Sequence, residues 1–306
     1  MMAGAWGLEI DKGRIGLCRA RLTSRGLEVT QGISLPLPSA LITPALTELN
    51  VAEGQALSGE LRTLMKKAGC RGGPVVLTLP DTSCRIGWQD FEALSGTPSE
   101  TRQLLCWRLK DRIPFPINES RIDYQPLPGQ GSGTRLLYLL AREAVIAQYE
   151  ALVASVGLEP TRIITRGVAL YRLQKTAGIG GKRLLLAAGP SSLLFVYVEE
   201  HIPRLWRVLP WDGHEPAADQ QHRVERLLRE LHTTIRYLRD EIRAGEPDRL
   251  VLMGEGEDTL AESLREACEL PVDTMPERRN GLRGELLAPA GAALLRQPWR
   301  PRWISR

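Results

Sequence analysis

The chain has 306 residues, of which 43% are hydrophobic and 25% are charged. This balance is typical of a soluble globular protein with one large domain or two ordinary ones. The net charge of +4 is matched by the arginines of the segment 296–306, which contains no acid, so the rest of the chain is electrically balanced. Bulk charge therefore predicts no nucleic-acid partner.

Targeting signals, apolar runs and the cysteine pattern narrow the class of protein further. No basic stretch followed by an apolar core opens the sequence, so we expect no signal peptide. The longest largely apolar run, 184–198, is too short to cross a bilayer. The five cysteines lie far apart without a C-x-x-C pair, which argues against a disulfide framework or a zinc cage and fits a reducing compartment.

The first part of the chain predicts a three-stranded meander. Strands are expected at 5–11, 14–22 and 27–35, because apolar residues alternate there and turn residues separate them. A helix over 57–68 and a buried strand over 75–79 follow. A Rossmann fold would place a helix directly after the first strand, so that class is not expected.

Residues 84–157 predict a compact α+β unit. Its expected elements are a strand at 84–91, a helix at 99–112, strands at 121–127 and 134–141, and a helix at 143–156. A strand at 161–165 and a helix at 167–176 follow this unit.

The remainder of the chain begins with a second meander. Its expected elements are strands at 183–188, 193–199 and 204–209, a long helix at 221–244, a strand at 249–253, and helices at 258–268 and 287–295. The repeated meander indicates an internal duplication.

One stretch carries a family resemblance. A helix ends in Ile113-Pro114-Phe115-Pro116, and Glu119 and the pair Asp123-Tyr124 follow. Similar pieces are VVLTLPDTS at 75–83, the run 139–163, RLVLMGEG at 249–256 and LAPAGAALL at 287–295. In their order and spacing the chain resembles PilM, the actin-like protein of type IV pilus assembly.

The resemblance implies an α/β, actin-like (ribonuclease H-like, duplicated) fold. The first half would be 1–176, with the inserted subdomain 84–157, and the second half would be 182–295. The family's second inserted subdomain would be missing or reduced near 210–220, because little chain separates the predicted strand and helix there.

The resemblance also implies an ATP site built from two hairpin loops and an adenosine-contacting turn, and the sequence departs from the pattern in each. The first loop has Glu9 and Asp11 where the family has Asp and Gly, and the second has Ala187 in place of a carboxylate. A carboxylate facing phosphate repels it, and magnesium loses a ligand. We therefore expect neither ATP turnover nor a cofactor.

The remnants of that pocket are expected to be vestigial. They are Asp11, Lys12, Gly13, Gly189, Ser191, Ser192, Gly254 and Gly256. The alternative is a weak ATPase or regulatory binding of ATP with Mg through Asp11, Gly13, Gly189 and Ser191, which requires the first strand to shift its register. No catalytic residue and no metal site is predicted, and the four histidines lack metal-ligand spacing.

The departures place the chain near scaffold relatives of PilM in mannose-sensitive pili and type II secretion. The resemblance implies a cytoplasmic protein, peripheral to the inner membrane, that holds the N-terminal tail of a PilN-like single-span membrane protein. The tail would lie between the inserted subdomain and the first half. Candidate contacts are Phe115, Ile122 and Tyr124, although Phe115 fits a core position equally well. Homo-oligomerisation stays an open expectation.

The C-terminal segment 296–306 interleaves tryptophans with arginines. Trp299, Arg300, Arg302 and Trp303 suit contact with an anionic membrane surface. The alternative is a disordered tail, or one whose tryptophans pack on the body.

Overall fold

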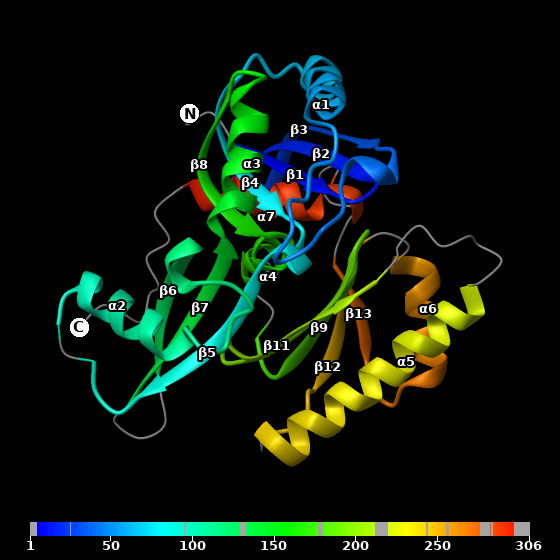
Figure 1. Cartoon of the computed structure of the whole chain (residues 1–306). Helices are drawn as coiled ribbons and strands as arrows, with labels where there is room; N and C mark the ends of the chain where they lie inside the picture. Colours follow the sequence, from blue (N-terminus) through cyan, green and yellow to red (C-terminus); the bar gives the residue numbers. More distant parts are fainter. Residues whose placement is uncertain are drawn as a thin grey trace.

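The computed structural model describes residues 5–24, 26–94, 96–128, 133–176, 180–211, 220–242, 244–254, 257–275, 282 and 284–296. Two five-stranded sheets and a smaller three-stranded sheet are found in these residues (Figure 1). The predicted tail residues Trp299, Arg300, Arg302 and Trp303 lie outside the described part of the chain, as does Gly256. No helix of the described residues is long and apolar enough to span a membrane.

The first sheet has the strand order β3-β2-β1-β4-β8. Its strands are β1 (Ala5–Asp11), β2 (Arg14–Thr23), β3 (Gly26–Pro36), β4 (Gly73–Leu79) and β8 (Leu158–Thr165). Strand β1 runs antiparallel to β2 and parallel to β4. Helices α1 (Gly54–Ala68) and α3 (Glu143–Ala154) share one apolar core with this sheet.

The second sheet repeats that arrangement in the order β11-β10-β9-β12-β13. Its strands are β9 (Arg183–Ala188), β10 (Ser192–Glu199), β11 (Ile202–Pro210), β12 (Arg249–Gly254) and β13 (Val272–Thr274). Helix α5 (Gln220–Tyr237), the π-helical turn Leu238–Ile242 and helix α6 (Glu257–Ala267) belong to its outer core. The matching strand orders confirm the predicted duplication and the actin-like fold class.

Two helices lie between the sheets and join the halves. Helices α4 (Arg166–Thr176) and α7 (Leu287–Ala293) share a core with residues of both sheets. They approach closely, because a Cβ added at Gly291 would lie 2.1 Å from the carbonyl oxygen of Ala169. Glycine therefore permits the backbone contact that fixes α7 on α4.

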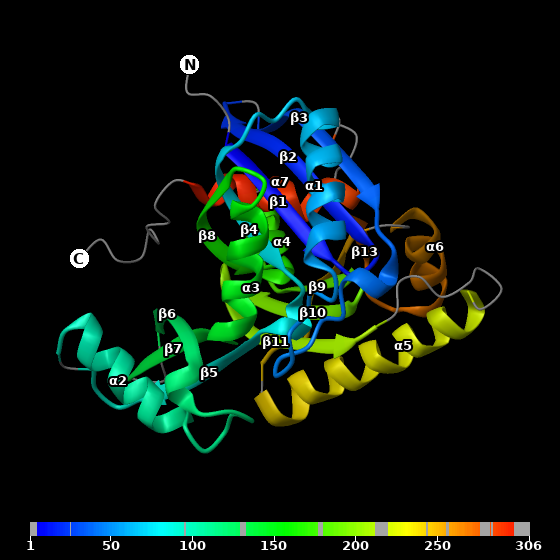
Figure 2. The same cartoon turned by 45° about the horizontal axis from the view of Figure 1, so that its top comes forward.

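The inserted subdomain projects from the first half (Figure 2). It consists of β5 (Arg85–Phe91), β6 (Ser120–Pro128), β7 (Thr134–Arg142) and helix α2 (Pro98–Leu109), with sheet order β5-β7-β6. Its core includes Leu105, Leu109 and Leu140. Helix α3 does not share this core, because Val145, Tyr149 and Val153 pack in the core of the first half. The predicted unit 84–157 thus included one helix that belongs to the first half.

Several predicted boundaries differ from the observed ones. Strand β8 starts at Leu158 rather than at 161, and α2 ends at Leu109 before the proline pair. The helix expected over 221–244 becomes π-helical after Tyr237, and the final α-helix ends at Ala293, followed by the 3-10 turn Leu294–Arg296. Only 211–219 separate β11 from α5, which leaves no room for a second subdomain.

Candidate functional site

The hairpins of the two halves meet at a buried hydrogen bond. Asp11 ends β1, and the turn Lys12-Gly13 follows, with Gly13 at a φ of 72°. The Asp11 Oδ1 atom accepts from the hydroxyl of Ser191, at 2.5 Å, and from the amide of Lys12, at 2.7 Å. Ser191 precedes β10, so this bond joins the first half to the second.

A second pair of contacts joins the same regions. Asp81 lies in the short 3-10 turn Asp81–Ser83 after β4 and is buried. Its Oδ1 atom accepts from the amide of Gly167, at 2.8 Å, and its Oδ2 atom accepts from the hydroxyl of Ser192, at 3.3 Å. One carboxylate therefore contacts both α4 and the hairpin of the second half.

Arg166 lies at the centre of this junction. It begins α4 and is only 1% exposed, and its Nε atom lies 3.2 Å from Glu9 Oε1. A Cβ added at Gly189 would lie 2.8 Å from Arg166 Nη1, and one added at Gly254 would lie 3.4 Å from Nη2. The guanidinium therefore packs against the backbone of both glycines.

The buried charges form one cluster, which we call the junction cluster: Glu9, Asp11, Arg14, Asp81 and Arg166. Arg14 Nη2 lies 3.2 Å from Glu9 Oε2, so Glu9 is shared by two guanidinium groups. Burial raises the pKa of Asp11 to about 6, and the charge of Glu9 adds to this effect. Burial also raises the pKa of Asp81, against the opposing charge of Arg166.

The predicted pocket remnants do come together at this junction. Asp11, Lys12 and Gly13 come from the first hairpin; Gly189, Ser191 and Ser192 from the second; and Gly254 ends β12. The register keeps Ile10 opposite Ile15, both fully buried, with Asp11 opposite Arg14. Arg166 could not be predicted from the sequence, because an arginine between a strand and a helix has no pattern that indicates its burial.

The residues present do not fit a magnesium nucleotide held through these loops. The Lys12 amide donates to its neighbour Asp11, the Gly189 amide donates to Ser192 O at 2.8 Å, and Pro190 has no amide hydrogen. Loops that cradle phosphate need such amides to point outward. Among the described residues no group of three metal-ligating side chains is found, and Arg166 fills the space beside both glycines.

A groove runs between the inserted subdomain and the body. Two adjoining cavities of about 380 and 420 Å³ share the wall residues Asp123, Leu139, Arg162, Ile163 and Ile164. Strands β6 and β7 form one wall, and β8 forms the other, with α4 continuing that wall in the larger cavity. We call these two cavities the subdomain groove.

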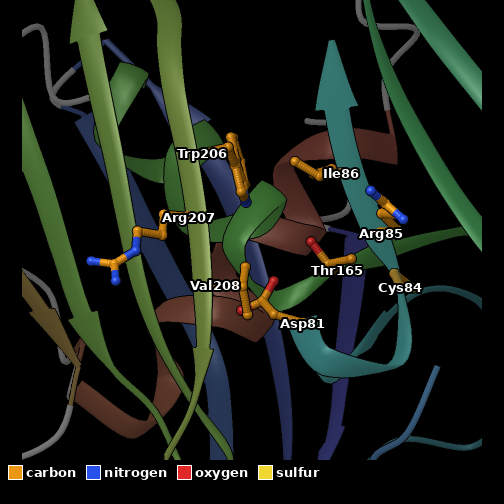
Figure 3. Close-up of a pocket in the computed structure, with 8 residues that line it drawn as sticks. All are labelled: Asp81, Cys84, Arg85, Ile86, Thr165, Trp206, Arg207 and Val208. Atoms are coloured by element: carbon orange, nitrogen blue, oxygen red, sulfur yellow. The ribbon is translucent and has the colours of Figure 1, made fainter. Parts of the chain in front are cut away.

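A third cavity of about 320 Å³ lies between β5 and β11 and shares Ile86 and Trp206 with the larger part of the subdomain groove. In Figure 3 the side chains of Trp206 and Val208 face Ile86 of β5, with Asp81 and Thr165 between them. Open space therefore extends from the subdomain groove towards the junction cluster.

The three predicted partner contacts lie in different surroundings. Phe115 packs in the core of the inserted subdomain and borders none of these three cavities, which fits the core alternative left open by the sequence. Ile122 is 4% exposed yet borders the 380 Å³ cavity, and Tyr124 borders the 420 Å³ cavity. Sequence reasoning missed Leu139 and Tyr171, because facing strands and helices come together only in the fold.

The groove is apolar with a basic end. In the 420 Å³ cavity, Ile163, Val168 and Tyr171 form the wall together with the cations Arg162, Arg172 and Lys175, and the acid there is Asp123. The main chain of β6 is partly occupied: the Tyr124 amide donates to Asp123, and the Ile122 carbonyl accepts from Arg102. A bound segment would therefore be held on that side mainly through side chains.

Comparisons with known proteins bear on the fold. No family model and no curated protein matches the chain. A solved PilM–PilN type IV pilus biogenesis complex matches with a TM-score of 0.78 and 22% identity, over 95% of this chain and 97% of the other. The cytoplasmic domain of EpsL, from the type II secretion system of Vibrio cholerae, matches with a TM-score of 0.52 and 11% identity, over 95% and 94%.

A protein with an actin-like ATPase fold from Bacteroides thetaiotaomicron matches with a TM-score of 0.53 and 10% identity, over 95% of each chain. The chain thus has an actin-like fold. Its architecture is similar to that of the solved PilM–PilN complex, in line with the resemblance of the sequence motifs.

Proposed function

We propose that this chain is a cytoplasmic, actin-like scaffold at the inner-membrane platform of a type IV pilus or a related secretion system. It holds the cytoplasmic N-terminal tail of a PilN-like single-span membrane protein and does not turn over ATP. The observation that carries the proposal is the match to the PilM–PilN complex over 95% of this chain, inserted subdomain included.

The subdomain groove supports the binding part of the proposal. Its two cavities offer about 380 and 420 Å³, room for several side chains of an extended peptide. The wall residue Leu139 is half-buried, whereas its neighbours Leu136 and Leu140 face the core of the inserted subdomain. The apolar wall favours leucine- or isoleucine-like side chains of the tail, because burying one contributes about 1.5–3 kcal/mol.

The junction cluster supports the absence of turnover. In a nucleotide-driven actin-like protein, ATP with Mg would bridge the two halves. Here Arg166 contacts Glu9 of the first half and lies against Gly189 and Gly254 of the second half. Asp11 and Asp81 complete the bridge through Ser191 and Ser192. The protein's own side chains thus bridge the two halves, which supports the proposed absence of turnover.

A peptide titration tests the proposal. The labelled cytoplasmic tail of the single-span membrane protein encoded beside this chain is titrated with the full protein, and fluorescence anisotropy is followed. We expect saturable binding that Leu139→Asp weakens more than tenfold, since a charge then faces the apolar wall. The matched control is Leu22→Asp, at a position that is 60% exposed on β2 and borders none of these cavities.

Retained binding by Leu139→Asp, with a melting temperature equal to that of the wild type, would exclude the subdomain groove as the site. No binding by the wild-type protein would exclude the scaffold function with this partner.

A further inference from the structure

Helix α2 is apolar on two faces. Its buried face carries Leu105 and Leu109, which pack in the core of the inserted subdomain. The opposite face carries Leu104 and Trp107, which are 38% and 60% exposed. Both views place α2 at the outer end of the inserted subdomain, away from the two large sheets (Figures 1 and 2). The fold therefore gives Leu104 and Trp107 no internal partner surface.

Cations surround the exposed tryptophan. The Arg108 guanidinium carbon lies 5.4 Å from the centre of the Trp107 ring, and Lys110 Nζ lies 5.8 Å from it. Just after the helix, the Arg85 side chain donates to the backbone carbonyl of Arg112, and the Arg112 guanidinium donates to Gln89. The acids of this stretch are Glu100, which caps the start of the helix, and the exposed Asp111.

These cations differ in their ion pairing from three arginines of the neighbouring sheet. Arg121, Arg135 and Arg142 each form an ion pair with a carboxylate. In the described part of the chain no carboxylate lies within ion-pair distance of Arg102 and Arg108 on α2, or of Lys110 and Arg112 just after it. Arg102 and Arg112 donate instead to the Ile122 carbonyl and to Gln89. The subdomain thus neutralises Arg121, Arg135 and Arg142 and leaves Arg108 and Lys110, beside Trp107, available to an external anion.

We propose that the exposed face of α2, with Leu104 and Trp107 among Arg108, Lys110 and Arg112, docks on an anionic lipid surface. The indole ring, with the cations Arg108 and Lys110 within 6 Å of its centre, suits the depth of lipid headgroups. Two large apolar side chains are enough for shallow insertion. They are too few for the core of a protein interface, which buries about 800 Å² per partner.

The test uses the full protein and co-sedimentation with phosphatidylcholine vesicles, with and without phosphatidylglycerol. We expect binding only to the anionic vesicles, and weaker binding at high salt. Each cation near an anionic surface contributes about fivefold in affinity, so Arg108→Ala/Lys110→Ala should weaken binding about twenty-five-fold. Adding Trp107→Ala to this double variant should weaken vesicle binding further, because it removes the ring that inserts among the headgroups.

Matched controls separate a surface effect from a loss of folding. Lys66→Ala/Lys67→Ala removes the same charge from the exposed side of α1, and Leu22→Ala removes an exposed apolar side chain from β2. Both should bind vesicles like the wild type, and all variants should keep its melting temperature. Vesicles contain no membrane protein, so the outcome is separate from the binding of a partner tail.

Three results would overturn the proposal. They are the absence of binding to anionic vesicles, unchanged binding by Trp107→Ala and Arg108→Ala/Lys110→Ala, and loss of binding in Trp299→Ala/Trp303→Ala alone. The last result would assign vesicle binding to the C-terminal segment instead of α2.

Discussion

Substituting Arg166 with methionine removes the central cation of the junction cluster and keeps most of the side-chain volume. Arg166 is 1% exposed and lies 3.2 Å from Glu9, with the charges of Asp11 and Asp81 also acting on it. Removing one partner of a buried ion pair costs about 3–5 kcal/mol, because the remaining charge stays buried. Glu9 keeps its other partner, Arg14, at 3.2 Å, so we expect a loss of stability at the lower end of this range, about 3 kcal/mol.

Urea unfolding at neutral pH measures this loss, with the slope m as the check that the unfolded state is unchanged. The control is Arg172→Met, the same substitution on the same helix. Arg172 is half-buried, its pKa is lowered by burial, and no carboxylate pairs with it in the described residues. The free energy of unfolding of Arg172→Met should lie within about 1 kcal/mol of that of the wild type. A loss of less than about 1 kcal/mol in Arg166→Met would refute the bridging role.

Two further predictions concern the same junction and the helices behind it. The pKa of Asp11 is raised to about 6 in the folded state from an ordinary value of 3.8, so the folded state binds more protons between these values and stability falls as pH rises through them. Asp11→Asn removes that loss of stability. In urea unfolding, the variant should be more stable than the wild type by up to about 3 kcal/mol at pH 7 and equally stable near pH 4. A difference in stability that does not depend on pH would contradict the raised pKa of Asp11. Gly291→Ala places a Cβ 2.1 Å from the carbonyl oxygen of Ala169 and should lower the free energy of unfolding by about 3 kcal/mol. The control Gly59→Ala, with open space around it on α1, should raise the free energy of unfolding by about 0.5–1 kcal/mol. Thermal unfolding that ranks the two variants the other way would refute the close packing of α4 and α7.

Much of the fold could be predicted because its elements carry local patterns. Alternating apolar residues predicted both meanders, and the 3–4 spacing of leucines predicted α1 and α5. The boundary of the inserted subdomain could not be predicted, because α3 follows β7 directly. Only packing shows that Tyr149 faces the first half. Strand β13 was missed because three residues, Val272–Thr274, are too few for periodicity.

The candidate sites were predicted unevenly for a related reason. Asp11, Gly189, Ser191 and Gly254 were found because the resemblance places them in hairpins and turns that the fold preserves. Arg166 was not, since its role depends on meeting Glu9, 157 positions earlier in the chain (166 minus 9). The place of Phe115 could not be predicted, because a proline-flanked aromatic residue has the same sequence pattern in a core as on a surface.

The proposed absence of ATP turnover depends on the junction cluster, whose buried side chains bridge the two halves. The most direct test is the melting temperature of the wild-type protein titrated with ATP and Mg. If Arg166 and its carboxylate partners fill the junction, the melting temperature stays constant up to about 10 mM nucleotide. A ligand with a dissociation constant of about 100 μM would add about 2.7 kcal/mol at that concentration, a shift of several degrees. Such a shift would contradict the account and favour an ATP-binding protein.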